Sequence, residues 1–208
     1  LGLASAYTQF GDATKARAAL EPLLTRDDSA EAQVLVAQTA LLEDKPEEAQ
    51  AALDRALKIS SRTPALHYYR GYLHWKRRET EEAIAEWREE LKLDTNSFLA
   101  TFALGGAIAM SATAQGDTKG ITEAEELLRR AITLKPRHAG ALYQLAKLTW
   151  RSKHKDTMAL LERAVKADPN HREAHYLLGT VYQSAGRKAD AAREFAAVKR
   201  ISQEGDRK

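Results

Sequence analysis

Histidine is the first residue type in this sequence that could support metal chemistry, because the 208 residues include six histidines and no cysteine. His171 and His175 are four residues apart, a spacing that places both on one face of a helix. The segment reads His-Arg-Glu-Ala-His, which differs from the zinc motif H-E-x-x-H. His67 and His74 are seven apart, and neither pair is joined by the third ligand that a zinc site needs. We therefore expect structural or surface histidines, no metal site and no cofactor.

Carboxylates gather in three short runs, at residues 81–82, 89–90 and 123–126. Most precede Lys or Arg or fall in the first turn of an expected helix, where the helix dipole stabilises an acidic side chain. General acid–base catalysis would need such groups together in a cleft. The sequence also lacks a Walker-type phosphate loop, the G-x-S-x-G nucleophile motif and G-x-G-x-x-G. We predict that the chain is not an enzyme.

Four aromatic residues lie within eight positions: Tyr68, Tyr69, Tyr72 and Trp75. Spacings of one, four and seven place them along one stripe of a helix. Tyrosine and tryptophan are typical of binding surfaces, because each combines a large apolar ring with a polar group. The alternative interpretation is that several of these rings pack between helices.

Charge is nearly balanced overall, with 32 Lys and Arg against 29 Asp and Glu and a net charge of +3. Residues 1–104 have 13 basic and 17 acidic side chains, whereas residues 105–208 have 19 and 12. Such a bias could steer an acidic partner toward the C-terminal half. The plainer interpretation is a solvated helical surface.

An uncharged stretch runs from Phe98 to Ala114 and includes Gly105 and Gly106. It falls short of the roughly 20 strongly apolar residues that a membrane span needs, so we expect a buried helix and no membrane span. No signal peptide is visible, and the chain opens with Leu1 inside a helical pattern. We expect a truncated N-terminus, which leaves a cytoplasmic or a periplasmic location open.

A pair of residues four apart, usually alanine followed by a large apolar residue, recurs six times along the chain. The pairs are Ala16/Leu20, Ala49/Leu53, Ala83/Trp87, Ala124/Leu128, Thr157/Leu161 and Ala191/Phe195. Successive pairs are separated by 33, 34, 41, 33 and 34 residues. A fixed period of this length indicates stacked helical hairpins that bury one another's apolar faces.

Period and motif resemble the tetratricopeptide repeat, a helix-turn-helix unit of about 34 residues. The last repeat matches best, with Leu178-Gly179, Tyr182 and Ala191/Phe195. The resemblance implies an all-α fold: one right-handed α-α superhelix, or solenoid, of about six repeats and twelve helices. The expected repeats are approximately 1–28, 29–62, 63–96, 97–137, 138–170 and 171–203. Small residues such as Gly71, Gly105 and Gly179 would let the two helices of a repeat approach closely, and the large residue of the second helix would fill the gap.

The 41-residue step exceeds 34 by seven residues, which is close to two helical turns. The extra residues fall around Ser111 to Gly120. We expect them to lengthen the first helix of the fourth repeat without rotating its apolar face. A longer loop should follow, because the segment from Gln115 to Gly120 is rich in turn-forming residues.

The resemblance also implies where a ligand would lie, because first helices line the concave groove of such solenoids. The candidate peptide- or partner-binding residues on these helices are Tyr68, Tyr69, Tyr72, Trp75, Phe102, Tyr143, Lys147, Trp150, Arg151 and Tyr176. Co-chaperones of this family bind a C-terminal carboxylate with Lys, Asn and Arg on these faces. Here the matching faces are apolar or aromatic, for example at Val34 and Leu35, so we expect a different ligand.

The leading hypothesis is therefore a non-catalytic protein–protein interaction scaffold with a peptide or protein partner in the groove. Nucleic-acid binding is not expected, because basic clusters such as Arg129-Arg130 are dispersed and no base-reading positions recur. The alternative is a regulatory or substrate-docking arm of a larger enzyme, or of a bacterial envelope or secretion assembly such as polysaccharide export or a glycosyltransferase. Homo-oligomerisation through open solenoid ends is a third hypothesis.

Overall fold

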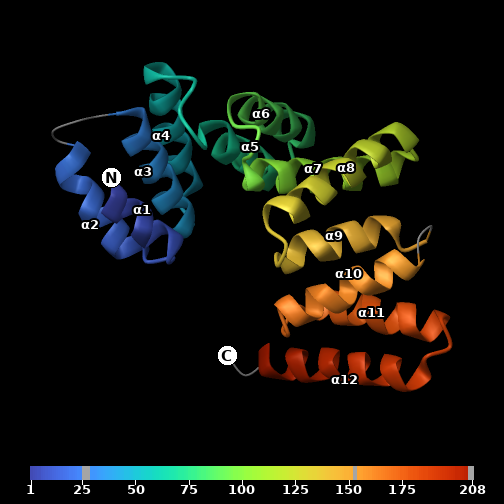
Figure 1. Cartoon of the computed structure of the whole chain (residues 1–208). Helices are drawn as coiled ribbons and strands as arrows, with labels where there is room; N and C mark the ends of the chain where they lie inside the picture. The colour runs from blue at the N-terminus through green and yellow to red at the C-terminus, as the bar shows by residue number, and fades with distance from the viewer. Residues whose placement is uncertain (25–28, 152–153, 206–208) are drawn as a thin grey trace. The chain divides into compact units, whose positions relative to one another are not determined.

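A computed structural model describes residues 1–24, 29–151 and 154–205 of the chain. These residues form twelve α-helices and contain no strand, which confirms the all-α prediction (Figure 1). The helices are α1 (Gly2–Gln9), α2 (Ala13–Leu24), α3 (Ala30–Leu42), α4 (Pro46–Ile59), α5 (Leu66–Lys76), α6 (Thr80–Leu93), α7 (Phe98–Gln115), α8 (Thr118–Leu134), α9 (Ala139–Thr149), α10 (His154–Ala167), α11 (Arg172–Ser184) and α12 (Lys188–Gly205).

Helices pack in sequential hairpins. The most extensive contacts join α1 to α2, α3 to α4, α5 to α6, α9 to α10 and α11 to α12. Within each unit, successive hairpins stack through a second helix and the following first helix, as α2 does on α3 and α10 on α11. This nearest-neighbour pattern is the one expected of a helical-repeat fold, because a single hairpin leaves an apolar face exposed.

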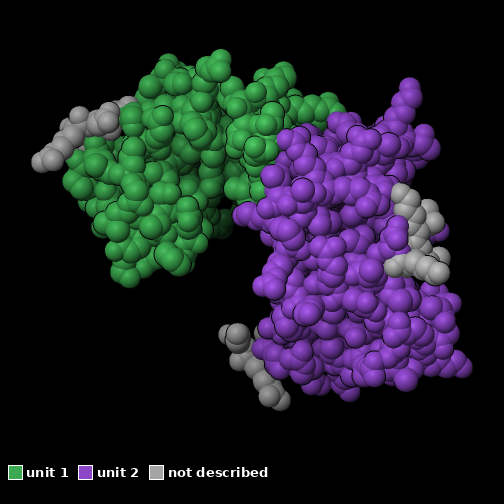
Figure 2. All heavy atoms as spheres, viewed as in Figure 1, with its two compact units in different colours: residues 1–100 green, residues 101–208 purple. Residues whose placement is uncertain are grey.

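The chain divides into two compact units, residues 1–100 and 101–208 (Figure 2). Unit 1 contains α1 to α6 and the first residues of α7, and its core includes Leu20, Leu53 and Leu73. Unit 2 contains the rest of α7 and α8 to α12, with a core around Leu142 and Leu178. The single continuous solenoid, with its superhelical course, stays a prediction.

Small residues allow the close helix contacts that the sequence predicts. A Cβ atom built on Gly71 would lie 2.5 Å from Nε1 of Trp87, and one on Gly179 would lie 2.7 Å from Cε1 of Phe195. A Cβ atom built on Gly105 would lie 3.2 Å from Cγ of Leu128, which is a less close approach. In these three hairpins the large residue of the second helix therefore occupies the space that a side chain on the first helix would need.

Five of the described hairpin turns share one backbone feature. Gly11, Gly116 and Gly186 have φ values of 74°, 69° and 76° and connect α1 to α2, α7 to α8 and α11 to α12. Asp44 and Arg78 adopt the same left-handed conformation in the turns after α3 and α5. A left-handed residue ends a helix by satisfying its last carbonyl groups, and glycine adopts it with least strain.

The seven-residue insertion is divided between two helices. The first helix α7 has 18 residues against 11 in α9 and 13 in α11, which confirms that it is longer. The longer loop predicted after it is wrong, since only Gly116 and Asp117 separate α7 from α8. The Asp117 carboxylate accepts a hydrogen bond from the backbone N–H of Lys119 at 3.0 Å and starts α8 early. As a result α8 has 17 residues, three more than α4 or α6.

Helix α7 is long and apolar enough to cross a membrane by length and composition, and 44% of its most apolar 18 residues are buried in the structure. A core helix of a folded domain meets the same criterion. Ala100, Leu104 and Ala107 of this helix are buried. Part of this apolar helix therefore packs in the core of the structure.

Candidate partner-binding surfaces

The aromatic stripe of α5 in unit 1 is partly used for packing. Tyr68, Tyr69, Tyr72 and Trp75 are all partly buried. Tyr69 packs against the core of the unit, and burial raises the pKa of its hydroxyl above the ordinary 10. The Tyr68 ring lies edge-on to it, with centroids 5.0 Å apart. These two rings support the packing interpretation that was left open for the stripe.

Trp75, farther along α5, faces Trp87 of α6 with ring centroids 6.0 Å apart. Trp87 is 2% exposed, and its indole N–H donates to the carbonyl oxygen of Tyr68 at 3.1 Å. Within the described part of the chain the Tyr72 hydroxyl makes no hydrogen bond, so Tyr72 is the member of the stripe with most freedom to contact a partner.

In unit 2, Phe102 and Tyr143 contact the histidine that begins the following repeat. The ring of Phe102 lies 5.0 Å from that of His138, and Tyr143 lies 5.0 Å from His171, centroid to centroid. Both histidines are N-caps. Nδ1 of His138 accepts the backbone N–H of Ala141 at 3.1 Å, and Nδ1 of His171 accepts a backbone N–H from the first turn of α11 at 3.4 Å. These aromatics therefore link successive repeats.

The remaining predicted residues form a more accessible set on α9, directly after its C-terminus and on α11, and the two helices are in contact. Lys147 and Arg151 are exposed, and the Arg151 guanidinium lies 5.2 Å from the centre of the partly buried Trp150 ring. Tyr176 is 61% exposed and is the most accessible aromatic of the predicted set. We call Lys147, Trp150, Arg151 and Tyr176 the first-helix surface of unit 2.

His67 and His175 hold their hairpins together. Nδ1 of His67 lies 2.6 Å from Oε2 of Glu86, and Nε2 lies 3.0 Å from the carbonyl oxygen of Ser61. His175 repeats the arrangement, with Glu194 at 2.6 Å and the carbonyl oxygen of Pro169 at 3.1 Å. For His67 the hydrogen bond to Glu86 raises the pKa of the imidazole above its ordinary 6.5. No cluster of three or more metal-ligating side chains occurs among residues 1–24, 29–151 and 154–205.

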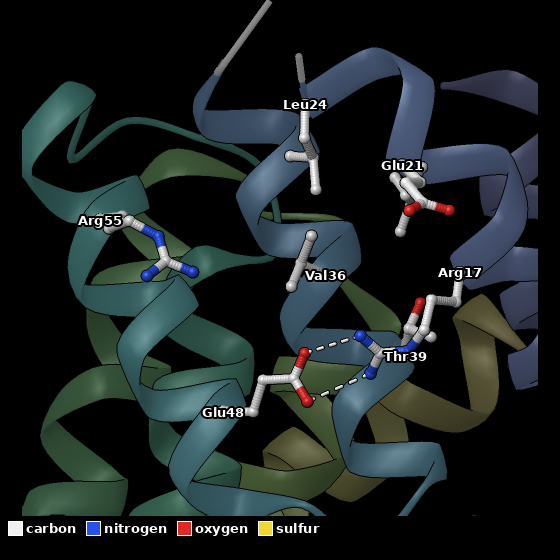
Figure 3. A pocket seen from close by; sticks show the side chains of 8 residues that line it. Arg17, Glu21, Leu24, Val36, Thr39, Glu48 and Arg55 are labelled. Carbon is white, nitrogen blue, oxygen red and sulfur yellow. Dashed lines mark hydrogen bonds and ion pairs between the residues drawn. The ribbon is translucent and has the colours of Figure 1, made fainter.

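A pocket of about 460 Å³ lies in unit 1 between the two second helices α2 and α4, with α3 beneath it (Figure 3). No sequence motif indicates this pocket, because its lining comes from three helices. The buried part of the lining is Leu20, Val36 and Thr39. Arg17, Glu21, Leu24, Glu48 and Arg55 complete the lining. None of these residues belongs to the aromatic set predicted on the first helices.

Arg17 joins the first hairpin to the second at one edge of this pocket. Its Nη1 donates to Glu48 at 2.8 Å and its Nε to Glu43 at 3.0 Å (Figure 3). Hydrogen bonds from Arg17 and then Lys45 lower the pKa of Glu43 from 4.5 to about 2. The charge of Arg17 is therefore already neutralised within the chain.

Two sequence profiles described as tetratricopeptide repeat match the chain, one at residues 1–61 and again at 42–98, the other at residues 151–207. With the repeating hairpins and left-handed turns, these matches define a helical-repeat protein. The chain belongs to the tetratricopeptide-repeat family. No curated protein matches it in a sequence comparison.

Solved structures share the fold at low sequence identity. PilF of Pseudomonas aeruginosa is 18% identical with a TM-score of 0.80, over 96% of this chain and 89% of PilF. PilW, a type IV pilus biogenesis factor, is 18% identical with a TM-score of 0.74, over 95% of this chain and 90% of PilW. YrrB, a tetratricopeptide-repeat protein with an unusual peptide-binding site, is 18% identical with a TM-score of 0.66, over 88% of this chain and 92% of YrrB.

Proposed function

We propose that this chain is a non-catalytic scaffold that binds a peptide or a partner protein on its first helices. The supporting observation is the first-helix surface of unit 2, where the 61% exposed Tyr176 accompanies two exposed cations, Lys147 and Arg151. Exposed aromatic and arginine side chains are the residues most often responsible for binding energy at protein interfaces. The cations favour a partner segment with acidic residues.

Only part of the predicted set is proposed as binding residues, because other members already make contacts within the fold. Tyr69, Phe102 and Tyr143 already contact the core or a capping histidine. Their truncation would disturb the fold and the binding together. Lys147, Arg151 and Tyr176 can be changed with little cost, because substitutions of exposed side chains usually alter stability by about 0.5 kcal/mol or less.

The alternative function is a docking arm within a larger envelope or secretion assembly. The observation that favours it is the shared fold of PilW, a type IV pilus biogenesis factor, over 95% of this chain. At 18% identity this likeness concerns the fold, so the assembly is a proposal about this chain and not a transfer of function.

The test combines Lys147→Glu, Arg151→Glu and Tyr176→Ala in one variant. A control variant carries Lys166→Glu and Lys199→Glu, two exposed cations on the second helices α10 and α12. Each protein is immobilised, exposed to lysate of the source cells and analysed by quantitative mass spectrometry. Parent and control should enrich the same proteins, and the triple variant should lose them. Equal enrichment by all three proteins would reject this surface as the binding site.

A further inference from the structure

The pocket between α2 and α4 provides a second recognition site that the first-helix surface does not include. Its volume of about 460 Å³ falls within the range of about 300 to 1,000 Å³ typical of ligand sites. The buried side chains of Leu20 and Val36 make its inner wall apolar. Space of this size over an apolar wall accommodates a bulky apolar side chain from outside the protein.

Polar groups of the inner wall are already satisfied. The Thr39 hydroxyl donates to the carbonyl oxygen of Leu35 at 2.8 Å. Glu48 accepts two hydrogen bonds from Arg17, at 2.8 and 3.1 Å. An apolar group could therefore enter without stripping a hydrogen bond from Thr39 or Glu48, a loss that would weaken its binding.

Two charged residues that line the pocket are Arg55 and Glu21. Unlike Arg17 and Glu48, they form no ion pair among the described residues. The exposed guanidinium of Arg55 donates through Nε to Gln33 at 2.9 Å, and within the described part of the chain it has no ion pair. Glu21, on α2, is exposed and likewise has no ion pair among the described residues. Figure 3 shows the two side chains on different helices around the pocket. The pocket thus presents one available cation and one available anion.

We propose that this pocket binds a segment of a protein partner in which a bulky apolar side chain is flanked by one acidic and one basic residue. The apolar side chain occupies the space over Leu20 and Val36, the acidic residue pairs with Arg55, and the basic residue pairs with Glu21. Complementary charges at both sides determine which segments bind, since a like charge at either position is repelled. This site is independent of the first-helix surface and does not require the function proposed for it.

The test uses three capped seven-residue peptides, acetylated and amidated, each with a central phenylalanine. One has Glu and Lys flanking the phenylalanine, one has two Glu, and one has two Lys. Binding is followed by amide shifts in nitrogen-15 NMR spectra of the whole 23.1 kDa chain. The Glu–Lys peptide should bind most tightly and should shift the amides of α2, α3 and α4.

Charge reversal in the protein makes the test specific. Arg55→Glu leaves two available acidic groups and should change the preference to the Lys–Lys peptide, whereas Glu21→Arg should change it to the Glu–Glu peptide. Each mismatched charge should weaken binding about two- to fivefold, as expected for an exposed ion pair. Lys58→Glu is the control, an exposed charge on α4 that does not line the pocket, and it should keep the parent's preference.

Three results would overturn the proposal. One is the absence of shifts in α2 to α4 with every peptide, and another is equal affinity of the parent for all three. The third is that peptide shifts appear on α9 and α11 alone, which would assign binding to the first-helix surface. Because the NMR test uses unit 1 substitutions and the capture test uses unit 2 substitutions, failure of either proposal is distinguishable from failure of the other.

Discussion

The carboxylate of Glu90, on α6, caps the N-terminus of α5. The N-cap residue itself is Ala65, whose side chain cannot accept a hydrogen bond. Oε1 of Glu90 accepts the backbone N–H of Ala65 at 2.9 Å, and Oε2 accepts that of Tyr68 at 3.2 Å. Glu90 is only 2% exposed, and Ala65 has a left-handed backbone with φ of 64°. In the second repeat the cap is a local serine, Ser29, so the third repeat has replaced a local cap with one from its partner helix.

Glu90→Ala should therefore destabilise unit 1 by about 2 to 3 kcal/mol, because two partly buried N–H groups lose a carboxylate acceptor. Urea unfolding followed by tryptophan fluorescence measures it, since Trp75 and Trp87 lie on the same hairpin. Glu89→Ala, the exposed neighbour that pairs with Lys92, is the control and should change stability by less than about 1 kcal/mol. Equal losses in the two variants would contradict the capping role.

Gly71→Ala should lower the free energy of unfolding by about 1 to 3 kcal/mol, because the new methyl group meets the buried Trp87 indole. Gly106→Ala is the matched control. It also lies inside a helix, but a Cβ there meets no atom within 4 Å. The control should gain about 0.5 to 1 kcal/mol from alanine's better helix propensity. Thermal unfolding of both variants checks the opposite signs, and a gain from Gly71→Ala would refute close packing at that position.

Glu43 should make stability fall in acid. Its pKa is lowered from 4.5 to about 2, so its contribution is present above pH 4.5 and is lost as pH falls from 4.5 toward 2. Glu43→Gln should be less stable than the parent by about 1 kcal/mol at pH 7, and this difference should shrink across that window. Urea unfolding at several pH values measures it, with the exposed Glu47→Gln as control. A difference that stays constant with pH would contradict the ion pair.

His67 should have the opposite pH dependence. The hydrogen bond to Glu86 raises the pKa of His67 above its ordinary 6.5. The stabilisation is therefore fully present below pH 6.5 and is lost as pH rises through the raised value. Arg70 also donates to Glu86 and keeps the carboxylate paired. His67→Gln should lose most stability relative to the parent at pH 5.5 and least at pH 9; unfolding curves with equal differences at both pH values would exclude a charged imidazole.

Local patterns were enough to predict the hairpins from sequence, because each depends on residues four apart and on a period near 34. Pairs such as Gly71 with Trp87 follow directly from that register. The loop after α7 could not be predicted as well, since composition favoured a turn over residues 115–120. Asp117, however, caps the N-terminus of α8, so Lys119 and Gly120 already belong to that helix.

Binding residues were harder to predict from the sequence. A helix face that packs against the next repeat has the same residue types as a face that is exposed to solvent. Phe102 and Tyr143 repeat at the same position as Tyr176, but the first two contact His138 and His171. In both repeats a proline, Pro136 or Pro169, stands two residues before the histidine, and this shared spacing could have indicated the caps. No comparable signal exists for the pocket, whose residues are dispersed between positions 17 and 55.

The two compact units share one continuous helix, and this determines how the protein can be dissected. A cut at the boundary itself, after Ala100, would remove the first turn of α7 from the C-terminal fragment. A cut before Ser97 retains the whole helix, together with the serine hydroxyl that accepts the Ala100 N–H at 3.4 Å. Fragments 1–96 and 97–208 are thus the natural pieces for assigning a ligand to one half of the chain.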